Sequence, residues 1–196
     1  PQAAIDKFGL AEEPTILFLS RVHPKKSIET LIEATSILKK RGIEIRVLIA
    51  GTGDDHYKQK MEQLAKKLHV SEQVEFLGLV VGDLKLSLYA LADIFALPTR
   101  QENFGLVYPE AMLCGTAILT TKGTDIWREL EQGGSTIVER TPESFADGLA
   151  KMLSDKKGLQ DVGLRGREFI QEWLNPDKIA KEYEDCYENA SPVIIC

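Results

Sequence analysis

The sequence lacks several features that would assign it to a large class of proteins. No apolar run in its 196 residues approaches the roughly 20 residues that a membrane-spanning helix needs. Its net charge of -6 at pH 7 provides no basic excess, so we expect no nucleic-acid partner. The three cysteines, Cys114, Cys186 and Cys196, do not have zinc-type spacing. A reducing, cytoplasmic location is the simplest interpretation.

Two nucleotide-binding motifs are also absent. The dinucleotide fingerprint G-x-G-x-x-G does not follow the first apolar run, which argues against a nicotinamide-dependent enzyme. The pattern G-x-x-x-x-G-K-[ST] does not occur, which excludes the P-loop nucleotidases. No basic-then-apolar leader is present and the chain does not begin with Met, so we expect a fragment or an excised domain.

What the sequence does contain is an alternation of short apolar runs and longer amphipathic stretches. Apolar residues spaced i, i+3, i+4 and i+7 predict the helices. Runs that are apolar throughout predict strands buried on both faces, and hence a parallel sheet covered by helices. The predicted strands are 15–20, 45–50, 74–77, 93–98, 117–121 and 135–139. The predicted helices are 28–38, 57–68, 84–91, 107–114, 142–154, 158–173 and 177–189.

This order predicts one doubly wound, Rossmann-like α/β domain with about six parallel strands and helices on both faces. Residues 1–14 are predicted to be a connector, and residues 15–196 the domain, with C-terminal helices from about residue 158. Ligands of such sheets bind beyond the carboxyl ends of the strands. The loops after residues 20, 50, 77, 98 and 121 are therefore the places to search for function.

The first of these loops is cationic. Arg21, His23, Lys25 and Lys26 precede a helix that Ser27 is expected to cap. Cations beside a helix N-terminus suit a phosphate group, because the amide donors and the helix dipole add to their charge. An ordinary solvated turn is the alternative interpretation, and the loop alone does not decide between the two.

The loop after the second strand contains two glycines, Gly51 and Gly53, which permit close approach of the backbone to a ligand. Asp54 or Asp55 is expected to cap the next helix. A lone G-x-G pattern has little specificity, so these glycines support a ligand site only together with the other loops.

The loop after the fourth strand, RQENFGLVYPEAM, places Glu102 before a glycine turn at Gly105 and Glu110 on the helix that follows. Carboxylates accept hydrogen bonds from vicinal hydroxyls, as in the recognition of ribose and other sugars. Backbone amides at the start of the helix add unpaired donors, which suit an anionic or hydroxyl-rich ligand. The order of glutamate, glycine turn, helix and glutamate is more specific than the spacing alone.

The segment ENFGLVYPEAMLCGTAILTTKGT (102–124) resembles the donor-site region of retaining glycosyltransferases of the GT-B fold, family 4 type, with their E-x7-E motif. The match also covers SRVHPKKSIETLIEA, IAGTGDD, VEFLGLV, YALADIFALPT and PESFADGLAKML, and so spans nearly the whole chain. The resemblance implies one half of a GT-B enzyme, the C-terminal domain that binds a nucleoside-diphosphate sugar. The N-terminal acceptor domain would be missing from this chain.

The resemblance also implies roles for individual residues. Glu102 would bind the transferred sugar, Glu110 the ribose hydroxyls, and Arg21 and Lys26 the diphosphate, with Arg21, Lys26 and Glu102 as the catalytic set. The other implied ligand-binding residues are Gly51, Gly53, Leu77, Gly78, Leu79, Asn103, Phe104, Gly105 and Leu106. Of these, 77–79 would lie near the base. No metal and no other cofactor is expected.

The sequence departs from the family pattern at two positions that matter here. Ser27 follows Lys26 where the family usually has glycine, and Ala117 stands where it usually has proline. The base, the donor sugar and the oligomeric state cannot be determined from the sequence. The acceptor, whether a glycan, a lipid or a small molecule, and peripheral membrane association through the missing half also stay open. A sugar-nucleotide epimerase of similar architecture and a non-catalytic binding module are the alternative functions.

Overall fold

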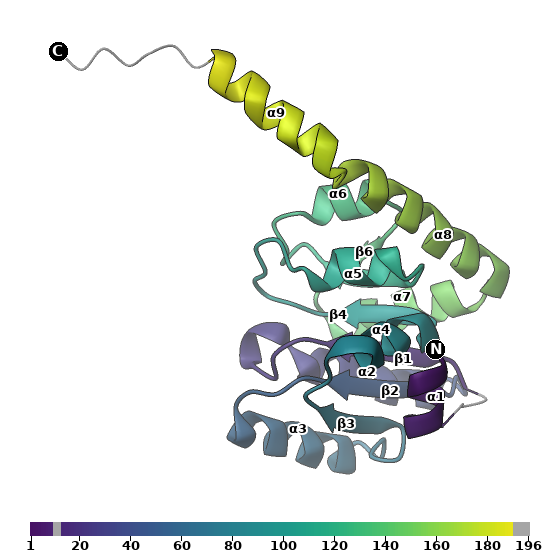
Figure 1. The fold of residues 1–196 in the computed structure, drawn as a ribbon. Coiled ribbons are helices and arrows are strands. Elements are labelled where there is room, and N and C mark those ends of the chain that lie inside the picture. The colour runs from purple at the N-terminus through teal and green to yellow at the C-terminus, as the bar shows by residue number, and fades with distance from the viewer. Residues whose placement is uncertain (10–12, 190–196) are drawn as a thin grey trace.

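The computed structural model describes residues 1–9 and 13–189, and it forms a single parallel sheet with helices on both faces (Figure 1). The strand order is β3-β2-β1-β4-β5-β6, and every neighbouring pair is parallel. This confirms the predicted doubly wound fold and its six strands. The strands are β1 (Thr15–Leu19), β2 (Arg46–Ala50), β3 (Val74–Gly78), β4 (Ile94–Leu97), β5 (Ala117–Thr121) and β6 (Thr136–Val138).

The helices lie in two layers. Helix α2 packs against α3 and α7 on one face, while α4 packs against α1 and α5, and α5 against α8, on the other. The helices are α1 (Gln2–Phe8), α2 (Ile28–Lys40), α3 (Asp55–Lys67), α4 (Gly82–Leu91), α5 (Val107–Leu113), α6 (Trp127–Gln132), α7 (Pro142–Leu153), α8 (Lys156–Trp173) and α9 (Pro176–Asn189). Within the described ranges, no helix is long and apolar enough to cross a membrane.

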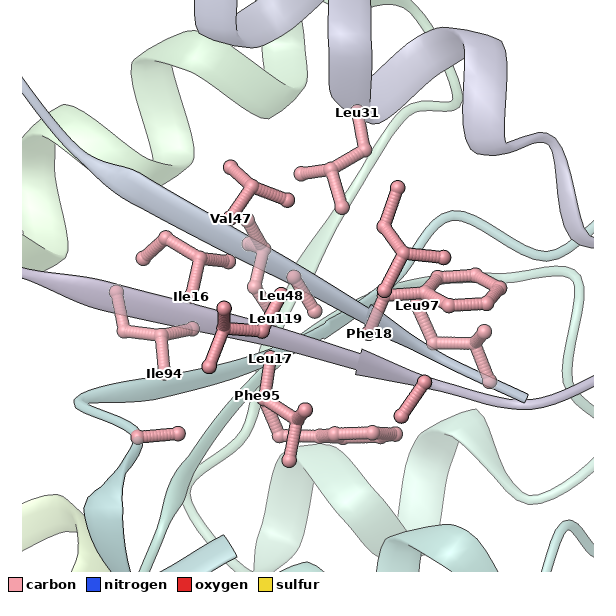
Figure 2. Close-up of a cluster of buried hydrophobic side chains, with 14 of the residues drawn as sticks. Ile16, Leu17, Phe18, Leu31, Val47, Leu48, Ile94, Phe95, Leu97 and Leu119 are labelled. Carbon is pink, nitrogen blue, oxygen red and sulfur yellow. The ribbon is translucent and has the colours of Figure 1, made fainter. Parts of the chain in front are cut away.

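The core lies on both sides of the central strands. All described side chains of β4 and β5 are buried, whereas the edge strands β3 and β6 are largely half-buried or exposed. Figure 2 shows Leu31 of α2 on one side of β1 and Phe95 of β4 on the other. Burial on two faces explains why these strands have continuous apolar sequences rather than alternating ones.

Three local features differ from the sequence predictions. The segment predicted as a connector contains α1, whose buried Ala4 donates its amide to Ser87 Oγ of α4 at 2.8 Å. Helix α6 was not predicted, because its six residues are too few to develop a clear period. Ser27 does not cap α2 with its side chain, since its backbone is left-handed. Asp54 does cap α3, because its carboxylate accepts from the Tyr57 amide at 2.8 Å.

Helix α9 extends away from the body of the domain (Figure 1). None of its residues is buried, and Tyr183 and Tyr187 are among the most exposed large side chains of the described chain. Its only described side-chain ion pair joins Lys178 to Glu172 of α8. The candidate site is therefore positioned by the sheet and by helices other than α9.

Candidate functional site

The site is built where the strand order reverses. Strand β1 has β2 on one side and β4 on the other, so the connections that leave β1 and β4 run to opposite faces of the sheet, and ligands of such sheets bind at this point. The two loops are joined by backbone contacts. The Arg100 amide donates to the Lys25 carbonyl at 2.8 Å, and the Thr99 hydroxyl donates to the same oxygen at 3.3 Å.

Between these two loops, Lys26 and Glu102 form an ion pair between Nζ and Oε2. Lys26 ends the short 3₁₀ helix η1 (Pro24–Lys26) and is only 4% exposed, whereas the Glu102 side chain is 23% exposed. A lysine this buried needs an anionic partner, because an unpaired ammonium would lose its hydration without compensation. Glu102 provides that charge and keeps part of its carboxylate accessible. Arg21, at the start of the same loop, is exposed.

The backbone of Glu102 is fixed by the loop after β5. Its amide donates to the Gly123 carbonyl at 2.8 Å, and its carbonyl accepts from the Asp125 amide at 2.9 Å. These bonds form an isolated parallel bridge between Glu102 and Thr124. The loop 122–125 was not assigned a role from the sequence, although the rule that selects loops after strands includes it.

Ser27 explains how Lys26 is oriented. Its backbone is left-handed, with φ 51° and ψ 48°, and it is fully buried. Only glycine adopts this conformation without steric cost. The Ser27 hydroxyl accepts from Arg100 Nε at 3.3 Å, so serine gains one contact between the two loops in exchange.

Polar contacts of Tyr57, Glu29 and Arg100 also hold this loop in place. The Tyr57 hydroxyl accepts from the Ile28 amide at 3.1 Å and donates to Glu29, and Arg100 lies 3.5 Å from the other Glu29 oxygen. Burial, followed by the hydrogen bond and charge of Glu29, raises the pKa of Tyr57 well above its usual value. Tyr57 therefore stays protonated and keeps donating at any physiological pH.

Gly51 and Gly53 allow the loops after β1 and β2 to lie against each other. A Cβ at Gly51 would be 1.9 Å from the Ser20 carbonyl oxygen, and one at Gly53 would be 2.2 Å from that of Val22. The Val22 amide donates to the Thr52 carbonyl at 3.0 Å. The close contact between the two backbones therefore explains why no side chain fits at these two positions. Their contact with a ligand stays a prediction.

The glycine turn between the glutamates is tightly packed. Gly105 has φ 66°, and a Cβ there would lie 2.8 Å from Glu102 Cγ. Phe104 stacks on Trp173 at the end of α8, with ring centroids 5.9 Å apart, and Trp173 also contacts Phe169. Asn103 is exposed, and its carbonyl accepts from the Thr124 hydroxyl at 3.4 Å. The turn is therefore held by α8 as well as by the loop after β5.

Glu110 lies on α5 and is held by two side chains of α4. Lys85 Nζ lies 2.6 Å from Oε1, and the Tyr89 hydroxyl donates to Oε2 at 3.0 Å. Tyr89 is fully buried, and burial, followed by the charge of Glu110, raises its pKa well above the usual value. Sequence reasoning missed both partners. Their i, i+4 spacing on the helix after β3 is the signal that was available.

The residues predicted to lie near a base form the end of β3. Gly78 accepts a hydrogen bond from the Gly51 amide at 2.7 Å, which ties this loop to the one after β2. Leu77 is half-buried, whereas Leu79 is 69% exposed. Leu106, which precedes α5, is 70% exposed. Two large apolar side chains thus face solvent in loops that leave the carboxyl ends of the strands.

Four hollows elsewhere in the described chain are lined by none of the predicted site residues. A hollow of about 420 Å³ beside the start of β6 is lined by Lys151, Asp155 and Arg165 among others, and by none of the predicted site residues. Within residues 1–9 and 13–189, no three His, Cys, Asp or Glu side chains gather as a metal site would require. The charges of the candidate site are those of its lysines, arginines and glutamates.

Comparison with known proteins identifies the family. The model for glycosyl transferases group 1 matches residues 2–169. The chain belongs to this family. It is 33% identical over 181 residues to an uncharacterized glycosyltransferase of Methanocaldococcus jannaschii, covering 91% of this chain and 46% of that protein. It is 29% identical to the GDP-mannose-dependent alpha-(1-6)-phosphatidylinositol monomannoside mannosyltransferase of Mycobacterium tuberculosis, covering 91% and 48%.

Solved structures confirm the GT-B type of fold. Anabaena HepE in complex with UDP superimposes with a TM-score of 0.82 at 20% identity, over 94% of this chain and 52% of that one. The C-terminal domain of a group 1 glycosyl transferase from Francisella tularensis gives 0.75 at 23% identity, over 87% and 91%. The chain spans about half the length of the curated relatives described above.

Proposed function

We propose that this chain is the donor-binding domain of a glycosyltransferase, which transfers a sugar from a nucleoside-diphosphate sugar to an acceptor with retention at the anomeric carbon. The observation that carries the proposal is the Lys26–Glu102 ion pair across the switch point of the sheet. A nucleoside-diphosphate ligand is supported by one relative that is GDP-mannose-dependent and by one structural neighbour that was solved in complex with UDP. Retention follows only from the resemblance of the E-x7-E segment.

In this proposal, Arg21 and Lys26 of the first loop bind the diphosphate. As the bond to the sugar breaks, negative charge builds on the leaving diphosphate, and Lys26 with Arg21 stabilises it. Lys26 is oriented in advance by its burial, so little reorganisation accompanies the reaction. Arg21 is exposed and free of such restraint, which suits a group that closes onto the ligand.

The acidic groups then bind the hydroxyls. Glu102 accepts from the transferred sugar through the part of its carboxylate that is accessible beside Lys26. Glu110 accepts from the ribose. Leu79 and Leu106, which are exposed, provide apolar surface for the base and the sugar. Amides of the turn that includes Phe104 contact the sugar and the diphosphate.

The proposal assigns neutralisation of the diphosphate to side chains rather than to a metal. Chelation by EDTA is therefore expected to leave donor affinity unchanged. It also assigns the acceptor to a second α/β unit that this chain does not supply. Because positioning of the acceptor contributes several kcal/mol to such a reaction, the chain alone is expected to bind the donor weakly and to transfer no sugar.

The experiment is a calorimetric titration of this chain with uridine, guanosine and adenosine diphosphate sugars. We expect the chain to bind one of the three series. In Glu110→Gln, the binding free energy should weaken by about 1–3 kcal/mol, because charge-assisted bonds to two hydroxyls become neutral. Glu188→Gln, on exposed α9, is the matched control. No binding of any donor would overturn the proposal. Robust transfer of labelled sugar by this chain alone would contradict the proposal that a second domain is needed to bind the acceptor.

A further inference from the structure

The two α4 residues that hold Glu110 carry an inference that goes beyond its predicted role. A carboxylate has about four lone-pair directions, two on each oxygen. Lys85 occupies one on Oε1, at 2.6 Å, and Tyr89 occupies one on Oε2, at 3.0 Å. One acceptor position remains on each oxygen. Two hydroxyls on adjacent carbons present one donor to each of these positions.

The helix that supplies the two groups is itself fixed. Ser87 lies between them in sequence, and its hydroxyl oxygen accepts a hydrogen bond from the amide of Ala4 in α1 at 2.8 Å. The Tyr89 carbonyl accepts from the buried Thr116 hydroxyl at 2.7 Å, and the Tyr89 ring packs edge-on against Phe95 of β4. A fully buried phenol held in this way has a single position for its hydroxyl. The orientation of the carboxylate is set by the protein before any ligand arrives.

We propose that Lys85 and Tyr89 are positioning residues that hold the Glu110 carboxylate ready for two vicinal hydroxyls, and so set a preference for ribonucleotides over 2′-deoxyribonucleotides. This inference rests on the proposed function, because it takes the ribose of a nucleoside diphosphate as the partner of Glu110. Lys85 fixes one oxygen by charge, and Tyr89 fixes the other by a buried hydrogen bond. Without either group, the carboxylate can rotate or accept water.

The test measures the dissociation constants of UDP, GDP and ADP and of their 2′-deoxy counterparts for this chain. The wild-type chain should prefer the ribonucleotide roughly ten- to hundredfold, the range for a hydrogen bond to a charged group. In Tyr89→Phe and in Lys85→Met, this ratio should fall at least about threefold. Lys85→Arg keeps the charge and should restore a ratio within about twofold of the wild-type value.

Matched controls separate positioning from a general structural role. Tyr57→Phe removes another buried phenol that donates to a glutamate, and Lys58→Met removes an exposed lysine with an i, i+4 partner, Glu62. Both should leave the ribo-to-deoxy ratio unchanged. If Tyr89 had only a structural role, Tyr89→Phe would lower the melting temperature and weaken the binding of the ribonucleotide and the deoxyribonucleotide equally. An unchanged ratio in Tyr89→Phe and Lys85→Met would overturn the inference while leaving nucleotide binding intact.

Two further outcomes are distinguishable. If the wild-type chain binds nucleotides with no ribose preference, Glu110 does not read the ribose and the inference is overturned. If it binds none of them, the proposed function fails and the inference fails with it. Should Tyr89→Phe not fold, Lys85→Met still decides, because the Lys85 side chain is 27% exposed and contributes little to the core.

Discussion

The two glutamates of the E-x7-E segment are held in opposite ways. Glu102 is fixed through its backbone, by bonds to the loop after β5, and pairs with a lysine from the loop after β1. Glu110 is fixed through its carboxylate, by two side chains of α4. The first arrangement joins segments that are 76 residues apart in sequence, and the second joins residues at most 25 apart.

The difference shows which changes each glutamate tolerates. A group held by backbone contacts moves when a loop is pushed aside, whatever side chains remain. When a partner side chain is truncated, a carboxylate held by side chains loses its orientation while its backbone stays in place. Stability and ligand affinity should therefore respond together at Glu102 and separately at Glu110.

The largest effect is expected for Gly123→Ala. A Cβ at this position would lie 2.1 Å from the Thr99 carbonyl oxygen, so the loop that holds Glu102 has to shift. We expect a loss of about 2–3 kcal/mol in the free energy of unfolding, measured by denaturant titration, and loss of affinity for the donor sugar. Gly42→Ala, where nothing lies within 4 Å of the added Cβ, carries only the cost of its positive φ. Equal losses in both variants would contradict the proposed crowding.

Lys26→Met tests the cationic side of Glu102. The variant should bind a nucleoside diphosphate about 1.5–3 kcal/mol more weakly while binding of the corresponding nucleoside changes little, because a charged hydrogen bond to the diphosphate is lost. Lys25→Met removes the same charge from the exposed neighbouring position and should have a smaller effect that disappears at high salt. Calorimetry at two salt concentrations makes the comparison. Equal losses for nucleoside and nucleoside diphosphate would assign Lys26 a structural role alone.

Tyr89 should contribute a pH dependence to stability on the Glu110 side. Its folded-state pKa lies above the ordinary value of 10.0, so the unfolded chain releases this proton first as the pH rises. The stability that Tyr89 provides is complete below pH 10 and is lost above it, by about 1.4 kcal/mol per pH unit. Tyr89→Phe should reduce the alkaline slope by that amount in denaturant titrations. An equal change in Tyr183→Phe, on exposed α9, would exclude Tyr89 as the cause.

The smallest effect is a gain, expected for Ser27→Gly. Glycine removes the steric cost of the left-handed backbone next to Lys26 but also removes the hydroxyl that meets Arg100. We expect a net increase of about 0.5–1 kcal/mol in the free energy of unfolding, with Lys26 still buried. Ser27→Ala keeps the strain, loses the hydroxyl, and should be less stable than the wild type. Thermal melts of the three chains decide, and a destabilised glycine variant would show that the hydroxyl matters more than the strain.

Much of the fold could be predicted because it depends on local sequence patterns. The largely apolar runs of β1, β4 and β5 required burial on both faces, and burial of this kind requires helices on both sides of the sheet. The helix α1 and the six-residue α6 escaped prediction, because short segments have no clear period and take their structure from what they pack against.

The sequence by itself determined the order of the strands along the chain and the residue types in the loops that follow them. Periodicity, turn residues and charge are properties of neighbouring positions, so they can be read from the sequence alone. Only the tertiary structure decided which of these residues meet. Lys26 meets Glu102 because β1 lies beside β4, and Glu102 meets Gly123 because β4 lies beside β5. Glu110 meets Lys85 and Tyr89 because α4 packs beside α5. The physical reason is that a hydrogen bond or ion pair acts over a few ångströms in space, whereas its two partners can lie any distance apart along the chain.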